Sequence, residues 1–190
     1  YKSYQKFDYG YDEIVAEYVG RPENIEIYNR NLEMLSEYYG GAEIMFENDR
    51  GEVLSYFKRR GKMHLLADQP DNVISKVIKD STVSRIKGCH MNDRMKDAGE
   101  KFILRWLWTE RGKRDDGSLV YNMDLIPSPA LIEELIQYHR QGNFDRVMGL
   151  MQLMFCVEES YEEEISSEPP KNSAATFLID NMNNMFKRKR

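Results

Sequence analysis

A short apolar run that ends in acidic residues is the feature that most constrains the fold of this chain. Residues 42–49 read AEIMFEND, so an apolar run at 44–46 stops abruptly at Glu47, Asn48 and Asp49. Such a run is typical of a buried strand, and a buried carboxylate costs free energy unless it is paired or binds a metal ion. Glu47 therefore either marks the point where the chain reaches the surface or is held by the strand as a functional group.

The segments before this run predict an α/β fold. Residues 1–7 are rich in strand-forming side chains, and residues 13–19 return as a second strand after a turn-like segment, which predicts an antiparallel pair. Residues 23–39 carry apolar side chains on one face of a helix. We expect a mixed central sheet, with residues 42–47 in its middle and helices on its faces.

The rest of the chain predicts mostly helices. Apolar periodicity and capping signals predict further elements in this order: a helix at 51–60, a short strand at 63–66, a helix within 70–87, a helix from Asn92 or Asp93 to about 109, a polar hairpin at 111–121, a helix at 130–140 after Ser128 and Pro129, and a final helix capped by Asn143. Trp106 and Trp108 fall on roughly opposite helix faces, so we expect one in the core and the other partly exposed.

The composition changes near residue 159. Residues 160–173 are acidic, polar and contain proline, and we expect them to be disordered. A short amphipathic segment follows and ends in the basic residues 187–190. We therefore divide the chain into a folded domain at 1–158 and a flexible acidic tail at 159–190.

Length and composition set further bounds. The chain has 190 residues, of which 41% are hydrophobic, so it can bury a substantial core. It has no apolar run long enough to span a membrane and no signal-peptide pattern, and we expect its two cysteines to be reduced. Because the sequence opens at Tyr1 inside a strand-like segment, we expect the chain to be one domain of a longer protein.

Basic clusters indicate where nucleic acid could bind, although the formal net charge is −5. Local clusters can hold a phosphate backbone even in an acidic protein. They are also common on solvated faces, and the sequence leaves both interpretations open. The residues concerned are Lys58, Arg59, Arg60 and Lys62 in the first cluster and Arg111, Lys113 and Arg114 in the second.

Asp145 is the second acidic residue of interest. It stands in the first turn of the final predicted helix, where the helix dipole favours a carboxylate. It shares a helix face with Met148, Gly149 and Gln152, and we expect Gly149 to let a sheet approach closely. The alternative is a capping residue on the surface. The sequence carries no phosphate-loop motif and no cysteine or histidine spacing typical of a zinc site.

Several short motifs together resemble the nuclease domain of the large terminase subunit of tailed phages. The resemblance covers about residues 1–158 and is carried by the order of the elements and by the motifs at 14–22, 44–49, 56–58 and 142–151. It implies a ribonuclease H-like fold. It also implies an endonuclease that cuts concatemeric DNA with two Mg²⁺ or Mn²⁺ ions.

The resemblance also assigns candidate site residues. Glu47 matches the second acidic ligand, Asp145 matches the third, and Asp49 is an auxiliary candidate. The first ligand of the family is an aspartate on a strand before the antiparallel pair, and no residue of this chain matches it. The alternative is therefore a catalytically inactive DNA-binding or docking module of the same fold.

The resemblance further implies where such a domain works. The expected partners are double-stranded DNA, an ATPase domain of the same parent chain, the portal and the small terminase subunit. The expected location is the host cytoplasm, docked on the viral procapsid and without membrane contact. We expect the isolated domain to be monomeric.

Overall fold

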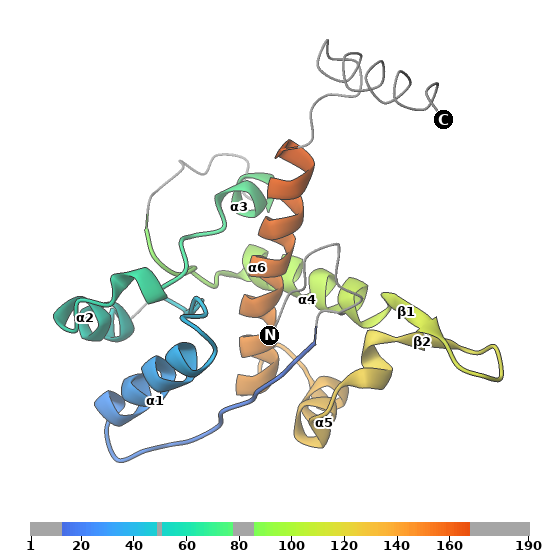
Figure 1. The fold of residues 1–190 in the computed structure, drawn as a ribbon, viewed down its shortest axis with the longest axis horizontal. Coiled ribbons are helices and arrows are strands. Elements are labelled where there is room, and N and C mark those ends of the chain that lie inside the picture. Colours follow the sequence, from blue (N-terminus) through green and yellow to red (C-terminus); the bar gives the residue numbers. More distant parts are fainter. Residues whose placement is uncertain (1–12, 49–50, 78–85, 168–190) are drawn as a thin grey trace, which may run out of the picture.

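The computed structural model describes residues 13–48, 51–77 and 86–167, without the side chains of 163–167. Helices dominate (Figure 1). In chain order the elements are α1 (Ile25–Tyr38), α2 (Glu52–Arg59), the 3₁₀ turn η1 (Met63–Leu65), α3 (Asp71–Val77), α4 (Asp93–Leu107), β1 (Glu110–Lys113), β2 (Leu119–Tyr121), the 3₁₀ turn η2 (Asn122–Leu125), α5 (Pro129–Gln137) and α6 (Asp145–Ser167).

Helix α6 is the central element of the fold (Figure 1). It packs against α3, α4 and α5, and its buried residues join those of α4 in the main hydrophobic core. The closest approach is at Gly99 of α4, where an added Cβ would lie 2.6 Å from Cγ of Met151 on α6. A side chain at position 99 would therefore require the Met151 side chain to shift.

A second, smaller core lies between α2, η1 and the segment 42–47. The side chains of Ile44 and Phe46 point into this core, whereas Met45 packs against the core around α6. This alternation is that of a β-strand, whose successive side chains point to opposite faces. Ser36 at the end of α1 holds the start of the segment, because its hydroxyl donates a 2.6 Å hydrogen bond to the carbonyl of Ala42.

The chain nevertheless forms little sheet. Its described residues contain one two-stranded antiparallel sheet, β1–β2, so the α/β class holds only in the coarse sense of helices with a small sheet. Segment 42–47 forms two isolated parallel bridges, Ile44 with Leu66 and Glu47 with Cys89. Because its two partners come from separate stretches of chain, no continuous ladder develops, and the expected mixed central sheet is not found in the described residues.

The strand expected at residues 13–19, the second of the N-terminal pair, does not form. Residues 14–22 run as an extended loop from beside α5 to the start of α1 (Figure 1). The other expected strand, at 1–7, lies outside the described residues.

A glycine is required beside segment 42–47, because Gly88 has φ +78° and an added Cβ would lie 2.6 Å from the carbonyl oxygen of Phe46.

The helix predictions were more accurate. Helices form where the sequence indicates α1, α2, α4 and α5, and Trp106 is buried while Trp108 is 62% exposed. The expected strand at 63–66 is instead a 3₁₀ turn followed by the bridge at Leu66. Helix α3 is described from Asp71 to Val77, and the helix expected within 70–87 also covers residues 78–85, which are not described.

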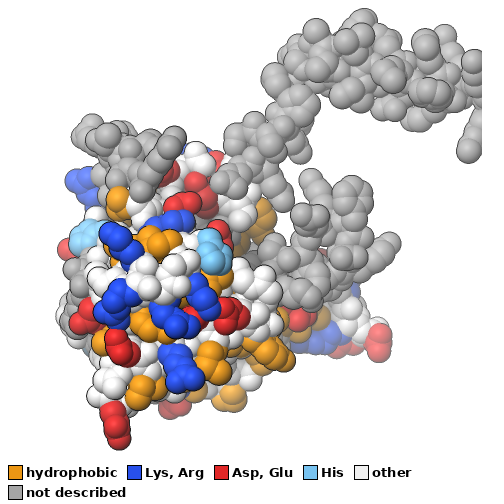
Figure 2. All heavy atoms as spheres, turned by 60° about the vertical axis from the view of Figure 1, so that its left-hand side comes forward, with side chains coloured by type: hydrophobic (Ala, Val, Ile, Leu, Met, Phe, Trp, Pro, Cys, Tyr) orange, Lys and Arg blue, Asp and Glu red, His pale blue; other side chains and the backbone are white. Residues whose placement is uncertain are grey.

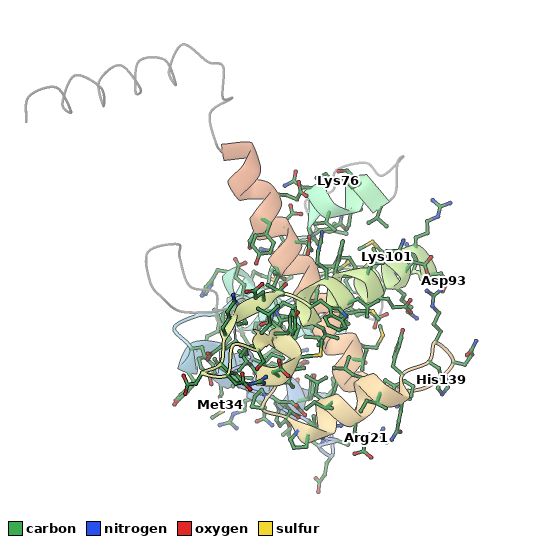
Figure 3. The ribbon with its side chains drawn as sticks, turned by 90° about the vertical axis from the view of Figure 1, so that its right-hand side faces the viewer. Arg21, Met34, Lys76, Asp93, Lys101 and His139 are labelled. Carbon is green, nitrogen blue, oxygen red and sulfur yellow. The ribbon has the colours of Figure 1, made fainter. Side chains whose placement is uncertain are left out.

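The expectation of disorder from residue 160 is wrong for residues 160–167, which continue helix α6. The physical reason is tertiary contact with α3. The carboxylate of Glu159 accepts hydrogen bonds from the backbone N–H groups of Asn72 (3.1 Å) and Val73 (3.0 Å), in the first turn of α3. One turn later Glu162 forms an ion pair with Lys76, which projects from α3 beside α6 (Figure 3).

None of the helices in residues 13–48, 51–77 and 86–167 combines the length and the apolar character needed to cross a bilayer.

Candidate functional site

A cleft of about 1280 Å³ separates α1 and the N-terminal loop from α6. We call it the α1–α6 cleft. Its walls are residues 14–21 of the loop, the inner face of α1, segment 42–47 and the face of α6 that includes Asp145, Gly149 and Cys156. Glu47 and Asp145 both line it, so the structure brings the two sequence-predicted ligands to one cavity.

Strand alternation directs Glu47 towards α6. Glu43, Met45 and Glu47 share one face of segment 42–47, and Met45 packs on the core around α6. Glu43 is close enough to α6 to influence Cys156: burial and then the negative charge of Glu43 raise the pKa of this thiol to about 11. Glu47 itself is exposed and belongs to the bridge with Cys89.

Asp145 is the first residue of α6 and is also exposed. Its carboxylate lies across the cleft from Tyr28 of α1. The pKa of the Tyr28 hydroxyl is raised mainly by burial, then by Tyr18, and then by the negative charge of Asp145. Asp145 is therefore placed where the walls formed by α1 and α6 face each other.

An ion-pair network that sequence reasoning missed fixes the start of α6. The Arg146 guanidinium donates to Glu134 of α5 (Nη1–Oε1 2.6 Å) and to Glu17 of the loop (Nε–Oε1 2.5 Å). Burial opposes the charged form of Glu17, but hydrogen bonds from Ser128 and Arg146 outweigh it and lower the pKa of this carboxyl group. The sequence gives no signal for it, because the residues come from distant parts of the chain.

The carboxylates of the cleft do not amount to a complete metal site. In the part of the chain that the structure describes, no three or more acidic, histidine or cysteine side chains gather in a metal-binding group. Asp49 lies outside the described residues. The expected close approach of a sheet to Gly149 is not found, since no heavy atom of the described residues lies within 4 Å of an added Cβ there.

The first basic cluster is largely engaged in intramolecular ion pairs. Figure 2 shows the side of the molecule that carries α1 and α2, where Lys and Arg side chains lie among acidic ones. Arg59 pairs with Glu26 of α1 (2.6 Å), and Arg60 and Lys62 both pair with Glu33. Lys58 is exposed and forms no ion pair with any described residue.

Glu33 is the centre of this network and is only 3% exposed. It accepts hydrogen bonds from Tyr56 (2.7 Å), from Arg60 (3.0 and 3.3 Å) and from Lys62 (2.5 Å). Hydrogen bonds from Arg60 and then Lys62 and Tyr56 outweigh the effect of burial and lower the pKa of Glu33 to about 2. A carboxylate satisfied in this way stabilises the contact of α1 with α2.

The second basic cluster lies on the β1–β2 hairpin. Arg111 donates to Oδ1 of the buried Asn122 (2.5 Å), and Arg114 pairs loosely with Asp124 (3.7 Å). Lys113 is exposed and has no ion-pair partner within residues 13–48, 51–77 and 86–167. Lys58 and Lys113 are therefore the members of the two clusters that are most available to an external phosphate.

Comparison of the chain with known protein families, with curated proteins and with solved structures found no match.

Proposed function

We propose that this chain is a metal-dependent DNA endonuclease domain of the terminase type, with a ribonuclease H-like organisation. One observation carries the proposal: Glu47 and Asp145, contributed by elements far apart in the sequence, both expose carboxylates to the α1–α6 cleft. Pairs of carboxylates from separate elements are the usual way in which nucleases hold divalent cations. Hard oxygen ligands favour Mg²⁺ or Mn²⁺.

The carboxylates of the cleft provide some of the oxygen ligands that such ions need. Glu47 and Asp145 would hold them, and Asp49 is the next candidate along the chain. When bound, the two ions supply an activated water and neutralise charge on the leaving oxygen. The role of the protein is to fix its carboxylates rigidly. The network of Arg146 with Glu17 and Glu134 does this for the start of α6.

The basic residues support binding of the DNA backbone in this proposal. Lys58 and Lys113 would neutralise phosphates. Arg59, Arg60, Lys62, Arg111 and Arg114 chiefly hold the two surfaces in shape. Contacts of this kind give affinity without base specificity. The proposal places the domain beside an ATPase domain of the same parent protein, acting at the portal with the small terminase subunit on a procapsid.

A second candidate function is a DNA-binding or docking module without catalysis. It is favoured by the lack of a third metal-binding side chain near Glu47 and Asp145 among the described residues. The ion pairing of most residues in the first basic cluster also gives that surface a structural role.

A plasmid-cutting assay distinguishes the two functions. We expect the chain to nick supercoiled plasmid with Mn²⁺ but not with EDTA, and we expect Glu47→Gln and Asp145→Asn to abolish nicking. Glu52→Gln is the matched control, because Glu52 also lines the cleft and should leave nicking unchanged. DNA binding without Mn²⁺-dependent cleavage would favour the docking module, and undiminished cleavage by Glu47→Gln would refute the site.

A further inference from the structure

Three polar side chains follow one another along the face of α1 that meets α2. Glu26, Asn29 and Glu33 share this face, because they are three and four residues apart. The outer two are satisfied from α2: Arg59 donates a 2.6 Å hydrogen bond to Glu26, and Tyr56 donates a 2.7 Å hydrogen bond to Glu33. Asn29, between them, is not.

Asn29 is only 1% exposed, and its Oδ1 is buried without a hydrogen-bond partner in the part of the chain that the structure describes. A buried acceptor without a donor costs free energy, so such groups are rare in folded proteins. A bound molecule that donates to Oδ1 would remove this cost.

A cavity of about 210 Å³ lies beside Asn29, between the two helices. We call it the Asn29 cavity. On the α2 side, Ser55 stands one turn before Arg59, and its short side chain forms no hydrogen bond with any residue that the structure describes. The lining residues are Ile25, Glu26 and Asn29 from α1, and Gly51, Glu52, Ser55, Tyr56 and Arg59 from the start and body of α2.

The unused polar groups of the cavity are mainly acceptors. They are Oδ1 of Asn29, Oε2 of Glu26 and the hydroxyl oxygen of Ser55, none of which has a partner within residues 13–48, 51–77 and 86–167. The lining carries two carboxylates and one guanidinium, which leaves one net negative charge. The ligand that fits is therefore a cation with several N–H donors. It must also be small, because pockets for drug-sized molecules hold about 300–1,000 Å³.

We propose that the Asn29 cavity binds a guanidinium group, the head of an arginine side chain, which donates to Asn29 and Glu26. A guanidinium is planar and carries five N–H donors, so it can bond to several acceptors at once. The same helix already shows this chemistry two turns away from Glu26, where Glu33 accepts hydrogen bonds from the guanidinium of Arg60 (3.0 and 3.3 Å).

The remaining walls suit the rest of an arginine side chain. Ile25 is 45% exposed and Tyr56 offers part of its ring, so the methylene groups would lie on apolar surface. The pair of Arg59 with Glu26 is exposed on both sides, so it can open at little cost to admit a ligand. The inference is independent of the proposed nuclease function, because it needs no metal ion.

Titration of the full chain with N-acetyl-L-arginine amide, followed by amide NMR in EDTA, tests the site. We expect saturable shifts of the Asn29 side-chain NH₂ signals and of the Ser55 backbone amide, with a Kd on the order of millimolar for so small a ligand. N-acetyl-L-citrulline amide is the matched control ligand, because its urea group has nearly the same shape but no charge. It should bind at least about tenfold more weakly.

Two variants locate the binding within the cavity. Asn29→Leu removes Oδ1 at nearly constant volume, so it should weaken binding at least about tenfold without lowering Tm, since an unsatisfied buried oxygen is lost. Ser55→Arg supplies a guanidinium from α2 itself, so it should raise Tm and abolish binding of the probe. Ser75→Arg on α3 is the matched control, because it adds the same side chain at another exposed serine and should leave binding unchanged.

A guanidinium group can come from the free amino acid or from a partner protein. Free L-arginine and the acetylated, amidated tripeptide Gly-Arg-Gly distinguish these sources: tighter binding of the amino acid indicates a metabolite, and tighter binding of the peptide indicates a protein. Either result supports the proposal. Absence of saturable shifts, equal Kd values for the arginine and citrulline probes, or an unchanged Kd in Asn29→Leu would each overturn it.

Discussion

The hydroxyl of Tyr56 on α2 donates a 2.7 Å hydrogen bond to Oε2 of Glu33 on α1, and both side chains are buried. This bond, together with the ion pairs of Arg60 and Lys62, joins the two helices through one carboxylate. Removing one partner of such a group leaves the others unsatisfied, which costs more than the bond itself contributes.

Stability should depend on pH through Glu33. Its pKa is about 2 in the folded chain against an ordinary value of 4.5. Because the folded value is the lower one, the stabilisation is present above about pH 4.5 and is lost as the pH falls from there towards about 2. Glu33→Gln should flatten the pH dependence of the free energy of unfolding in this window and lower stability near pH 7 by about 1–3 kcal/mol.

Urea unfolding at a series of pH values measures this effect. Glu26→Gln is the control, because the exposed pair of Glu26 with Arg59 should contribute less than about 1 kcal/mol. Identical pH profiles for the original chain and Glu33→Gln would show that Glu33 is not held as a satisfied anion.

Two glycines should respond oppositely to alanine. Gly99→Ala should destabilise the fold by about 1–3 kcal/mol, because its Cβ would lie 2.6 Å from Met151. Gly149→Ala should stabilise it by about 0.5–1 kcal/mol, because alanine is the better helix former and no described atom lies within 4 Å. Thermal melts of the two variants measure the difference. A loss of stability in Gly149→Ala would mean that the cleft is filled at that point.

The lysines of the first basic cluster should separate by role. Lys58→Ala should weaken binding of a DNA duplex and reduce the slope of log K against log salt by about 0.9, with little change in stability. Lys62→Ala should lower stability, because Lys62 pairs with Glu33 and Glu37. Binding titrations at several salt concentrations, together with melts, check both. Equal effects of the two variants on binding would contradict this division.

Divalent cations should stabilise the chain through the α1–α6 cleft. At a hundredfold excess of Mn²⁺ over its Kd, the gain is about 2.7 kcal/mol for one site. Glu47→Gln and Asp145→Asn should each remove the Mn²⁺-dependent rise in Tm, and Glu52→Gln should retain it. If all three variants shift as the original chain does, the ion binds elsewhere.

Truncation should define the end of the folded unit. A chain ending at residue 158 loses the carboxylate that accepts hydrogen bonds from the first turn of α3, whereas a chain ending at 167 keeps it. We expect a clear drop in Tm for the shorter chain and almost none for the longer one. Glu159→Gln removes the negative charge without shortening the chain. Its Tm should lie between those of the two truncated chains.

Local signals in the sequence were sufficient to locate helices α1, α2, α4 and α5. Asn92 and Ser128 cap α4 and α5 through their side chains, as their positions indicate. The sheet could not be predicted in the same way, because the partners of Ile44 and Glu47 are set by packing of distant segments. The same limit applies to the end of α6, whose acidic residues look unstructured until their contacts with α3 are known.

The sequence identified some residues of the candidate site and missed others. The motifs around Glu47 and Asp145 identify two carboxylates that share a cleft. They say nothing of Arg146, which fixes the start of α6 through Glu17 and Glu134. The basic residues were identified by composition alone, and composition does not reveal that Arg60 and Lys62 are held by a buried glutamate.

The contact of Glu159 with α3 also bears on the order in which the chain folds as it is synthesised. Helix α3 leaves the ribosome many residues before Glu159. The N–H groups of its first turn therefore lack this hydrogen-bond acceptor until α6 has been synthesised. The main core is delayed for the same reason, since α4 has no partner for Gly99 until Met151 has been made. Such long-range contacts slow folding and prolong exposure of apolar surface. During translation the N-terminal half of this protein should therefore depend on chaperones, and it should become resistant to protease only when helix α6 is complete.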